Sequence, residues 1–227
     1  MNPYLVVRDF EDALCEYTGS HYAVAVSSCT MAIQLAVAWC LSNEAIPPEM
    51  HPVNVEIPKR TYVSVPMSII HAGGKPVFRD ENWLGRYRLD PLPVFDSARW
   101  FYSGMFNDVK IEDTRFRATG TQPMIAQERN IMLCASFHAS KTLGDTQGGA
   151  ILHDSPEADV WLRKARFDGR TEGVAPKDDT FTQIGYHCYM SPDVAARLLL
   201  KMYSLPKHND PLPNDDYPDL SLMEIFK

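Results

Sequence analysis

One lysine in this sequence, Lys141, is placed where it could do covalent chemistry. It lies in the stretch SFHASKTLGDTQGG, residues 136–149, between apolar runs at 131–135 and 150–152. This pattern predicts a strand, a tight loop that carries the lysine, and a second strand. Partial burial at such a sheet edge lowers the pKa of a lysine amine and makes it a nucleophile for a Schiff base. A loop lysine that faces water would show the same spacing, so the pattern alone leaves both interpretations open.

A second stretch has the pattern of an anion site. Residues 21–28, HYAVAVSS, predict a short strand, and the following SSCTMAIQLAVAWCL begins with hydroxyl residues and continues as a long apolar helix. Unpaired amides and the helix dipole at such an N-terminus both favour a bound anion. An ordinary helix N-cap has the same residue types.

A carboxylate ends a third apolar stretch, LPVFDSARW, residues 92–100. A strand that ends in Asp96 would deliver this carboxylate to the carboxyl edge of a parallel sheet, where open α/β folds bind their ligands. The alternative is that Asp96 caps a helix that follows it.

Composition limits the classes of protein. The chain has 227 residues, 45% of them hydrophobic, which suits a single α/β domain. A net charge of −7 argues against an extended nucleic-acid surface. We expect no membrane span and no signal peptide, and therefore a cytoplasmic protein. The five cysteines are scattered without a CxxC pair, which argues against a disulfide framework and against a zinc site.

The elements that would position these residues follow from apolar periodicity and from glycine and proline breaks. We expect a helix over 8–19 closed by Gly19, a strand over 53–57, a helix from near Thr61, and a strand over 76–78.

Two stretches have less regular patterns. Residues 104–130, with Gly120 and Pro123, predict a hairpin or surface excursion. We assign residues 1–205 to one large domain. Residues 206–227 are an acidic, proline-rich tail that we do not expect to form a packed unit.

Several segments, taken in chain order, resemble those of one known family. They are SSCTMAI, the stretch NVEIPKRTYVSVPMSIIHAGGKPVFRD, LPVFDSARW, SFHASK with its GG-containing strand, and GYHCYMSPDVAARLLLKM. They are similar, in the same order, to segments of the DegT/DnrJ/EryC1/StrS family, the pyridoxal-phosphate-dependent sugar aminotransferases of fold type I.

The resemblance implies an α/β fold: the large domain of a fold type I transferase, with a mostly parallel sheet flanked by helices. Family members place a helix, a strand and a helix where this chain has only residues 80–93. We therefore expect a shortened form, one strand short and without the C-terminal small domain. The sheet would close over the gap by pairing its neighbours or with help from a partner chain.

The resemblance also implies roles for individual residues. Lys141 would hold pyridoxal phosphate as a Schiff base, and Asp96 would pair with the pyridine nitrogen. Arg99 stands where the family has a glutamine near the phenolic oxygen, and His187 where it has an asparagine that reaches a phosphate across a dimer interface. The remaining candidates are the phosphate-binding residues Ser28, Cys29, Thr30 and Ser136 and the ring-stacking Tyr62. Cys29 replaces a glycine of the family pattern.

The implied function is amino transfer, typically from glutamate, to a keto-sugar nucleotide or a similar carbonyl substrate, in a homodimer with shared sites. Lysine at 141 disfavours the dehydratase branch, which has histidine there. A truncated, non-catalytic descendant that acts as a binding or scaffold protein is the alternative. A cofactor-dependent enzyme with a larger substrate or a partner subunit is a third possibility. Joint presence of Lys141 and Asp96 favours an enzyme, because a scaffold needs neither.

Overall fold

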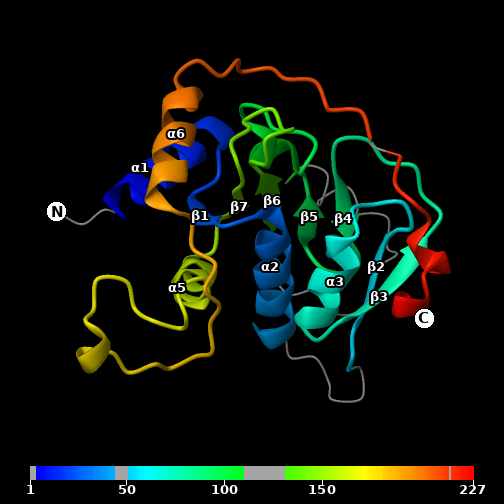
Figure 1. The fold of residues 1–227 in the computed structure, drawn as a ribbon, viewed down its shortest axis with the longest axis horizontal. Helices are drawn as coiled ribbons and strands as arrows, with labels where there is room; N and C mark the ends of the chain where they lie inside the picture. The colour runs from blue at the N-terminus through cyan, green and yellow to red at the C-terminus, as the bar shows by residue number, and fades with distance from the viewer. Residues whose placement is uncertain (1–3, 44–50, 110–130, 215) are drawn as a thin grey trace.

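The computed structural model describes residues 4–43, 51–109, 131–214 and 216–227 (Figure 1). Its helices are α1 (Leu5–Thr18), α2 (Cys29–Asn43), α3 (Ser64–His71), α5 (Pro156–Ala165) and α6 (Pro192–Met202). Its strands are β1 (Tyr22–Val26), β2 (Asn54–Pro58), β3 (Lys75–Arg79), β4 (Tyr87–Leu89), β5 (Val94–Asp96), β6 (Met132–Ser136) and β7 (Gly149–His153). Short 3₁₀ turns are η2 (Pro176–Asp178), η3 (Leu220–Leu222) and η4 (Glu224–Phe226).

The main sheet has the strand order β1-β7-β6-β5-β4, and β2 and β3 form a separate pair. The pairs β5–β6 and β2–β3 are parallel, whereas β1–β7, β6–β7 and β4–β5 are antiparallel. We expected a mostly parallel sheet, and this prediction is wrong: the main sheet is mixed. Strands β4 and β7 run in the opposite direction to the strands beside them, so the three pairs that they form are antiparallel.

The expected gap in the sheet is filled from within the chain. β4 pairs with β5, and an isolated antiparallel bridge joins Glu56 of β2 to Asp90, the residue after β4. Two backbone hydrogen bonds form this bridge, of 2.6 Å from the Glu56 amide and 3.1 Å from the Asp90 amide. Within the described residues the chain's own strands make this connection, and a contribution from a partner chain stays a prediction. A short reversed strand leaves fewer edge groups unpaired than an open gap would.

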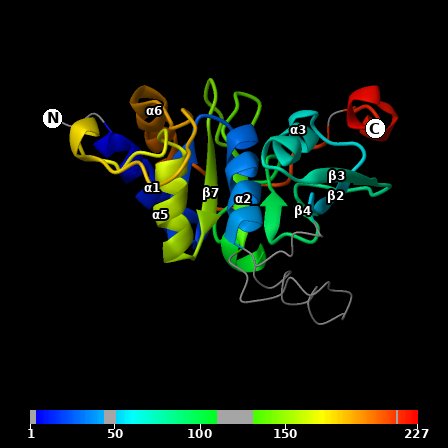
Figure 2. The ribbon, with the colours of Figure 1, turned by 90° about the horizontal axis from the view of Figure 1, so that it is seen from below.

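Helices cover both faces of the sheet because side chains alternate along each strand. In β1, Val24 and Val26 join one apolar cluster, whereas Ala23 and Ala25 join another. The first cluster packs against α2, α3 and α5, and the second against α1 and α6. Figure 2 shows this layered arrangement from below.

Several expected elements are confirmed with shifted ends. Helix α1 begins at Leu5 and ends at Thr18, and it is capped by Gly19, whose φ of 84° is the left-handed conformation that favours glycine. Helix α3 begins at Ser64 rather than near Thr61, because the residues between them form a turn closed by the bond from the Val65 amide to the Tyr62 carbonyl. Most of the expected 104–130 excursion lies outside the described residues.

The cysteines are free thiols, and all but the half-buried Cys15 are buried. In the described part of the chain, no helix is both long enough and apolar enough to cross a membrane.

Candidate active site

A cavity of about 330 Å³ lies where β5 and β6 end and where α2 and α3 begin. Eight of the nine residues predicted from the sequence line it: Ser28, Cys29, Thr30, Tyr62, Asp96, Arg99, Ser136 and Lys141. These residues come from four separate stretches of chain, so the fold brings together what the sequence presents as separate motifs.

Lys141 lies in the loop between β6 and β7, as expected, and its side chain is half-buried. The loop is tight: the Lys141 amide donates to the His138 carbonyl at 2.8 Å. A Cβ at Gly144 would lie 2.7 Å from the Ala139 carbonyl oxygen and 2.8 Å from that of Lys141. The loop can therefore close in this way only around a glycine, which sets the position of the lysine backbone.

The far end of this loop is tied to α6 by an ionic cluster. Asp145 accepts hydrogen bonds from Arg197 Nη2 at 2.9 Å and from Lys201 Nζ at 3.0 Å. The Arg197 hydrogen bonds hold the pKa of the Asp145 carboxyl well below its usual range. The carboxylate thus stays ionised and anchors the lysine loop.

Asp96 forms the floor of the cavity and is buried. Its Oδ1 accepts from the Ala98 amide and its Oδ2 from the Tyr87 hydroxyl, both at 2.9 Å. Burial raises the pKa of Asp96, while these two bonds and the charge of Lys141 act in the opposite direction. A buried carboxylate with a raised pKa is stabilised by a cationic partner, and a protonated pyridine nitrogen fits this need.

The anion turn is shaped by close backbone packing. A Cβ at Gly149 would lie 2.5 Å from the Cys29 amide nitrogen, so β7 can approach this turn only with glycine there. Ser28 Oγ accepts from the Met31 amide at 3.2 Å, so this serine caps α2 while it also lines the cavity. Cys29 has its side chain buried in the core. The Cys29 side chain, which we expected at the place of a glycine, therefore packs within the protein.

Further hydroxyl groups and one aromatic ring lie around this turn. Thr30 Oγ1 and Ser64 Oγ are 2.8 Å apart, which joins the N-termini of α2 and α3. Ser136 ends β6 and is buried. Tyr62 is 57% exposed although it lines the cavity, so much of its ring is open to a flat ligand that could stack on it.

Arg99 lines the cavity, but its hydrogen bonds go to the C-terminal segment. Nη1 donates to the Tyr217 hydroxyl at 3.2 Å, and Nη2 donates to the Pro213 carbonyl. A role for Arg99 at the phenolic oxygen of a cofactor stays a prediction, and its clearest structural role is to hold this segment.

His187 is the one predicted residue that does not line the cavity. Its side chain is 71% exposed, and Nδ1 lies 2.8 Å from Asp168 Oδ2. A role across a dimer interface stays a prediction.

The fold adds several residues to the cavity wall that the sequence motifs do not include. Thr61, Trp83, Gln147 and Tyr217 line it, and Tyr87 lies behind Asp96. Thr61 and Ser64 lie next to Tyr62 at the start of α3, so the helix N-terminus could have indicated them. No local signal marks Tyr217, which lies in the proline-rich tail.

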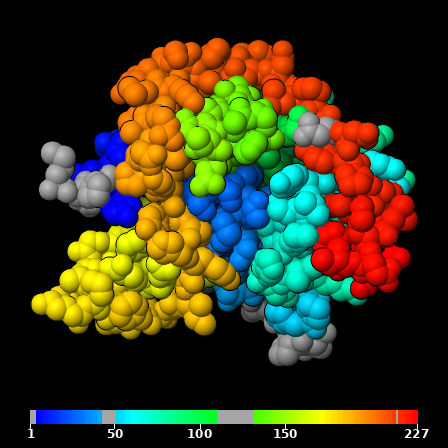
Figure 3. Space-filling model, viewed as in Figure 1, coloured from blue at the N-terminus to red at the C-terminus, as the bar shows by residue number. Residues whose placement is uncertain are grey.

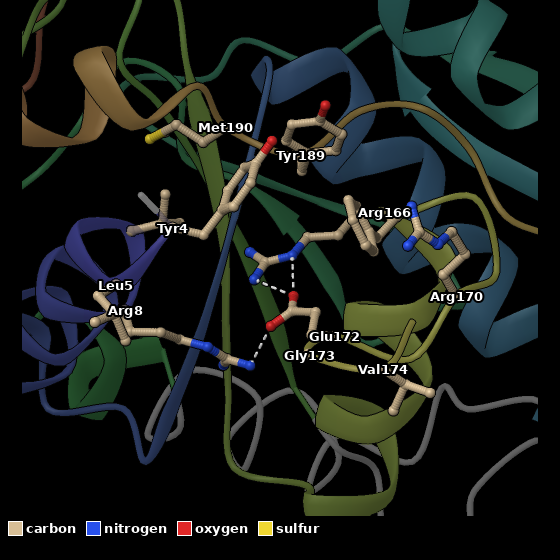
Figure 4. Close-up of a pocket in the computed structure, with 12 residues that line it drawn as sticks. Tyr4, Leu5, Arg8, Arg166, Arg170, Glu172, Gly173, Val174, Tyr189 and Met190 are labelled. Carbon is tan, nitrogen blue, oxygen red and sulfur yellow. Dashed lines mark hydrogen bonds and ion pairs between the residues drawn. The ribbon is translucent and has the colours of Figure 1, made fainter. Parts of the chain in front are cut away.

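A second cavity of about 470 Å³ lies between the start of α1 and residues 166–190 (Figure 4). Its chemistry is different, because arginines and tyrosines line it without a lysine. Arg8 and Arg166 both donate to the carboxylate of Glu172, and Arg166 also bonds to the buried Glu11. The guanidinium groups of Arg8 and Arg166 thus bind carboxylates of the protein itself. The candidate cofactor residues lie in the first cavity.

Comparison with solved structures shows that the chain has the fold of the fold type I aminotransferases. Similar structures include a DegT DnrJ EryC1 StrS aminotransferase from Brucella abortus, with 21% identity and a TM-score of 0.62 over 89% of this chain and 59% of that one. NtdA from Bacillus subtilis, solved with bound cofactor PMP, has 20% identity and a TM-score of 0.63 over 88% and 48%. The sugar aminotransferase CalS13 from Micromonospora echinospora has 16% identity and a TM-score of 0.64 over 88% and 60%.

The family resemblance is confirmed in the N-terminal part. The model of the DegT/DnrJ/EryC1/StrS aminotransferase family matches residues 2–90. The chain spans between 48% and 60% of the length of the three structures above.

Proposed function

We propose that this chain is a pyridoxal-phosphate-dependent aminotransferase. It would transfer an amino group from glutamate to a keto-sugar nucleotide or a similar carbonyl substrate. The observation that carries the proposal is that one cavity is lined by Lys141, Asp96, an anion turn at Ser28 to Thr30 and the exposed ring of Tyr62. The matched family and the similarity of the fold to CalS13, a sugar aminotransferase, support the sugar class of substrate.

Each part of the cofactor has a matching group in this cavity. Lys141 would hold it covalently, and the buried Asp96 would bind its ring nitrogen. The Ser28 to Thr30 turn and Ser136 would bind its phosphate. When bound, pyridoxal phosphate supplies an electron sink that makes the proton on the substrate carbon labile.

The chain's own residues would do the rest. The Lys141 amine, half-buried at the cavity wall, would carry the proton between the substrate carbon and the cofactor. Asp96 would keep the ring nitrogen protonated, because a buried carboxylate favours a positive charge next to it. We also propose a homodimer, in which the exposed His187 would complete the site of the partner.

The test is covalent attachment at one lysine. Incubation with pyridoxal phosphate should give a visible absorbance band, and borohydride followed by peptide mapping should place the label on Lys141. Lys141→Ala should abolish the band and the label. Lys177→Ala, which removes an exposed lysine outside the cavity, should leave both unchanged.

A protein that stays colourless under saturating cofactor would refute the proposal and would favour the binding or scaffold alternative. A label spread over surface lysines would refute the role of Lys141. Once attachment is established, loss of the band on adding glutamate would test the amino donor.

A further inference from the structure

Residues 206–214 and 216–227 lie along the domain (Figures 1 and 3) and are hydrogen-bonded to it at several places. Figure 3 shows this segment, orange to red, running along one edge of the molecule from α6 to the side of α3. At its start, the Lys207 carbonyl accepts from the Ser103 amide at 2.8 Å, and the Asn209 carbonyl accepts from Trp100 Nε1 at 2.9 Å. The segment therefore follows the loop after β5 from its first residues.

The far end of the segment is anchored by burial and charge. Leu220 is buried, and its amide donates to the Lys59 carbonyl at 2.9 Å. Asp219 Oδ2 lies 3.2 Å from Lys59 Nζ. The Phe226 ring packs on Phe78 of β3, with ring centroids 5.8 Å apart. An acidic segment is thus held beside basic residues, which is the complementary arrangement.

Between these anchors the segment forms part of the cavity wall. Leu212 bonds through its amide to the Arg99 carbonyl at 2.8 Å, and Tyr217 receives the Arg99 Nη1 hydrogen bond. The Tyr217 ring stacks on Trp83, with centroids 6.3 Å apart and planes at 14°. Both rings line the same cavity as Lys141.

The volume of the cavity limits the size of what can bind beside this wall. Its volume of about 330 Å³ is near the lower limit of pockets that hold one drug-sized ligand, about 300–1,000 Å³. A cofactor together with a whole sugar nucleotide exceeds this volume. Tyr217, as part of the wall, therefore bounds the space available to the reacting part of a substrate.

We propose that Tyr217 is a specificity-determining residue, which limits the size of the group that can be joined to the cofactor inside the cavity. This inference rests on the proposed function. Tyr217 would admit only substrates whose reacting part is no larger than a single sugar ring.

The test measures binding of two stable probes, the phosphopyridoxyl adducts of glycine, which has no side chain, and of tryptophan, which carries a large indole. The full chain should bind the glycine adduct about tenfold or more tighter than the tryptophan adduct. Tyr217→Ala should bring the ratio of the two dissociation constants close to one. Tyr217→Phe should keep the original ratio because it keeps the ring.

A matched control is Tyr203→Ala, which removes an 82% exposed tyrosine outside the cavity and should leave the ratio unchanged. Hydrogen exchange supplies a readout that needs no cofactor. Peptides that contain Leu212 and Leu220, whose amides bond to the domain, should exchange more slowly than unstructured peptides.

Two results would overturn the inference while the proposed function stands. One is a size ratio that is the same in the original chain and in Tyr217→Ala, with the label on Lys141 intact. The other is exchange of the 206–227 peptides at the rate of a free chain. If neither adduct nor pyridoxal phosphate binds the original chain, the proposed function itself fails, and this inference fails with it.

Discussion

Tyr87→Phe should change the pH dependence of cofactor binding without removing any group that lines the cavity. Burial raises the pKa of the Tyr87 phenol well above its usual range, so it stays protonated and donates its one proton to Asp96 Oδ2. Thr61 Oγ1, at 2.7 Å from the same hydroxyl, must then be the donor to Tyr87. The hydrogen bonds from Thr61 to Tyr87 and from Tyr87 to Asp96 together fix the orientation of the buried carboxylate.

The magnitude follows from the charge of the acceptor. A hydrogen bond to a charged group contributes about 1.5–3 kcal/mol, and each pKa unit corresponds to about 1.4 kcal/mol. Loss of the Tyr87 bond should therefore raise the pKa of Asp96 further. The proposed cofactor site needs Asp96 ionised, so the pH below which affinity falls should move up, and the affinity at a fixed pH below that midpoint should fall by about tenfold or more.

The assay is titration with pyridoxal phosphate, followed by absorbance, at a series of pH values. At pH values well above the midpoint, the dissociation constant of Tyr87→Phe should approach that of the original chain. Tyr102→Phe is the matched control, because Tyr102 donates to Asp108 at 2.8 Å and does not line the cavity. Equal midpoints in the two variants would refute the assignment of Asp96 as the ring-nitrogen partner.

Three further substitutions test other parts of the structure. Gly149→Ala should weaken binding of pyridoxal phosphate in the same titration by about tenfold or more, because its Cβ would lie 2.5 Å from the Ser28 backbone; unchanged affinity would contradict the phosphate assignment. Burial lowers the pKa of His153 to about 4, so the native state resists a proton that the unfolded state accepts near pH 6.5, and stability is lost as the pH falls between these values. His153→Leu lacks this titration, so between pH 7 and pH 4 its free energy of unfolding in urea should fall by about 3 kcal/mol less than that of the original chain. Equal pH dependence of the two free energies would contradict this. Glu11→Gln should lower the free energy of unfolding in urea by about 3 kcal/mol, because it leaves Arg166 buried beside a neutral partner; a loss below about 1 kcal/mol would show that Glu172 suffices.

The parts of the site that lie close together in sequence could be predicted from it. The Lys141 loop is bounded by two apolar strands and closed by nearby glycines, so its pattern is local. The anion turn likewise depends on a strand followed directly by a hydroxyl-led helix. In both cases the backbone conformation is set by residues within a few positions.

The rest depends on contacts between distant residues. β4 has only three residues, too few to show an alternating pattern, and its direction is set by pairing with β5 and the bridge to β2. Residues 206–227 have the composition of an unpacked tail, and the expected boundary at 205 stays a prediction. Their docking depends on Leu220 and on acceptors for Arg99, which local composition does not reveal.

Arg99 links the floor of the cavity to its wall. Its positive charge acts on Asp96 in the direction that favours the ionised carboxylate, while its hydrogen bonds hold Tyr217 and the Pro213 carbonyl. A guanidinium with several donors in one plane can hold two acceptors on the segment and also place a positive charge near the carboxylate, whereas a glutamine amide has two donors but no charge. The docking of the C-terminal segment and the charge near Asp96 are therefore two parts of one arrangement, in which the residue that holds the wall also acts on the charge of the floor.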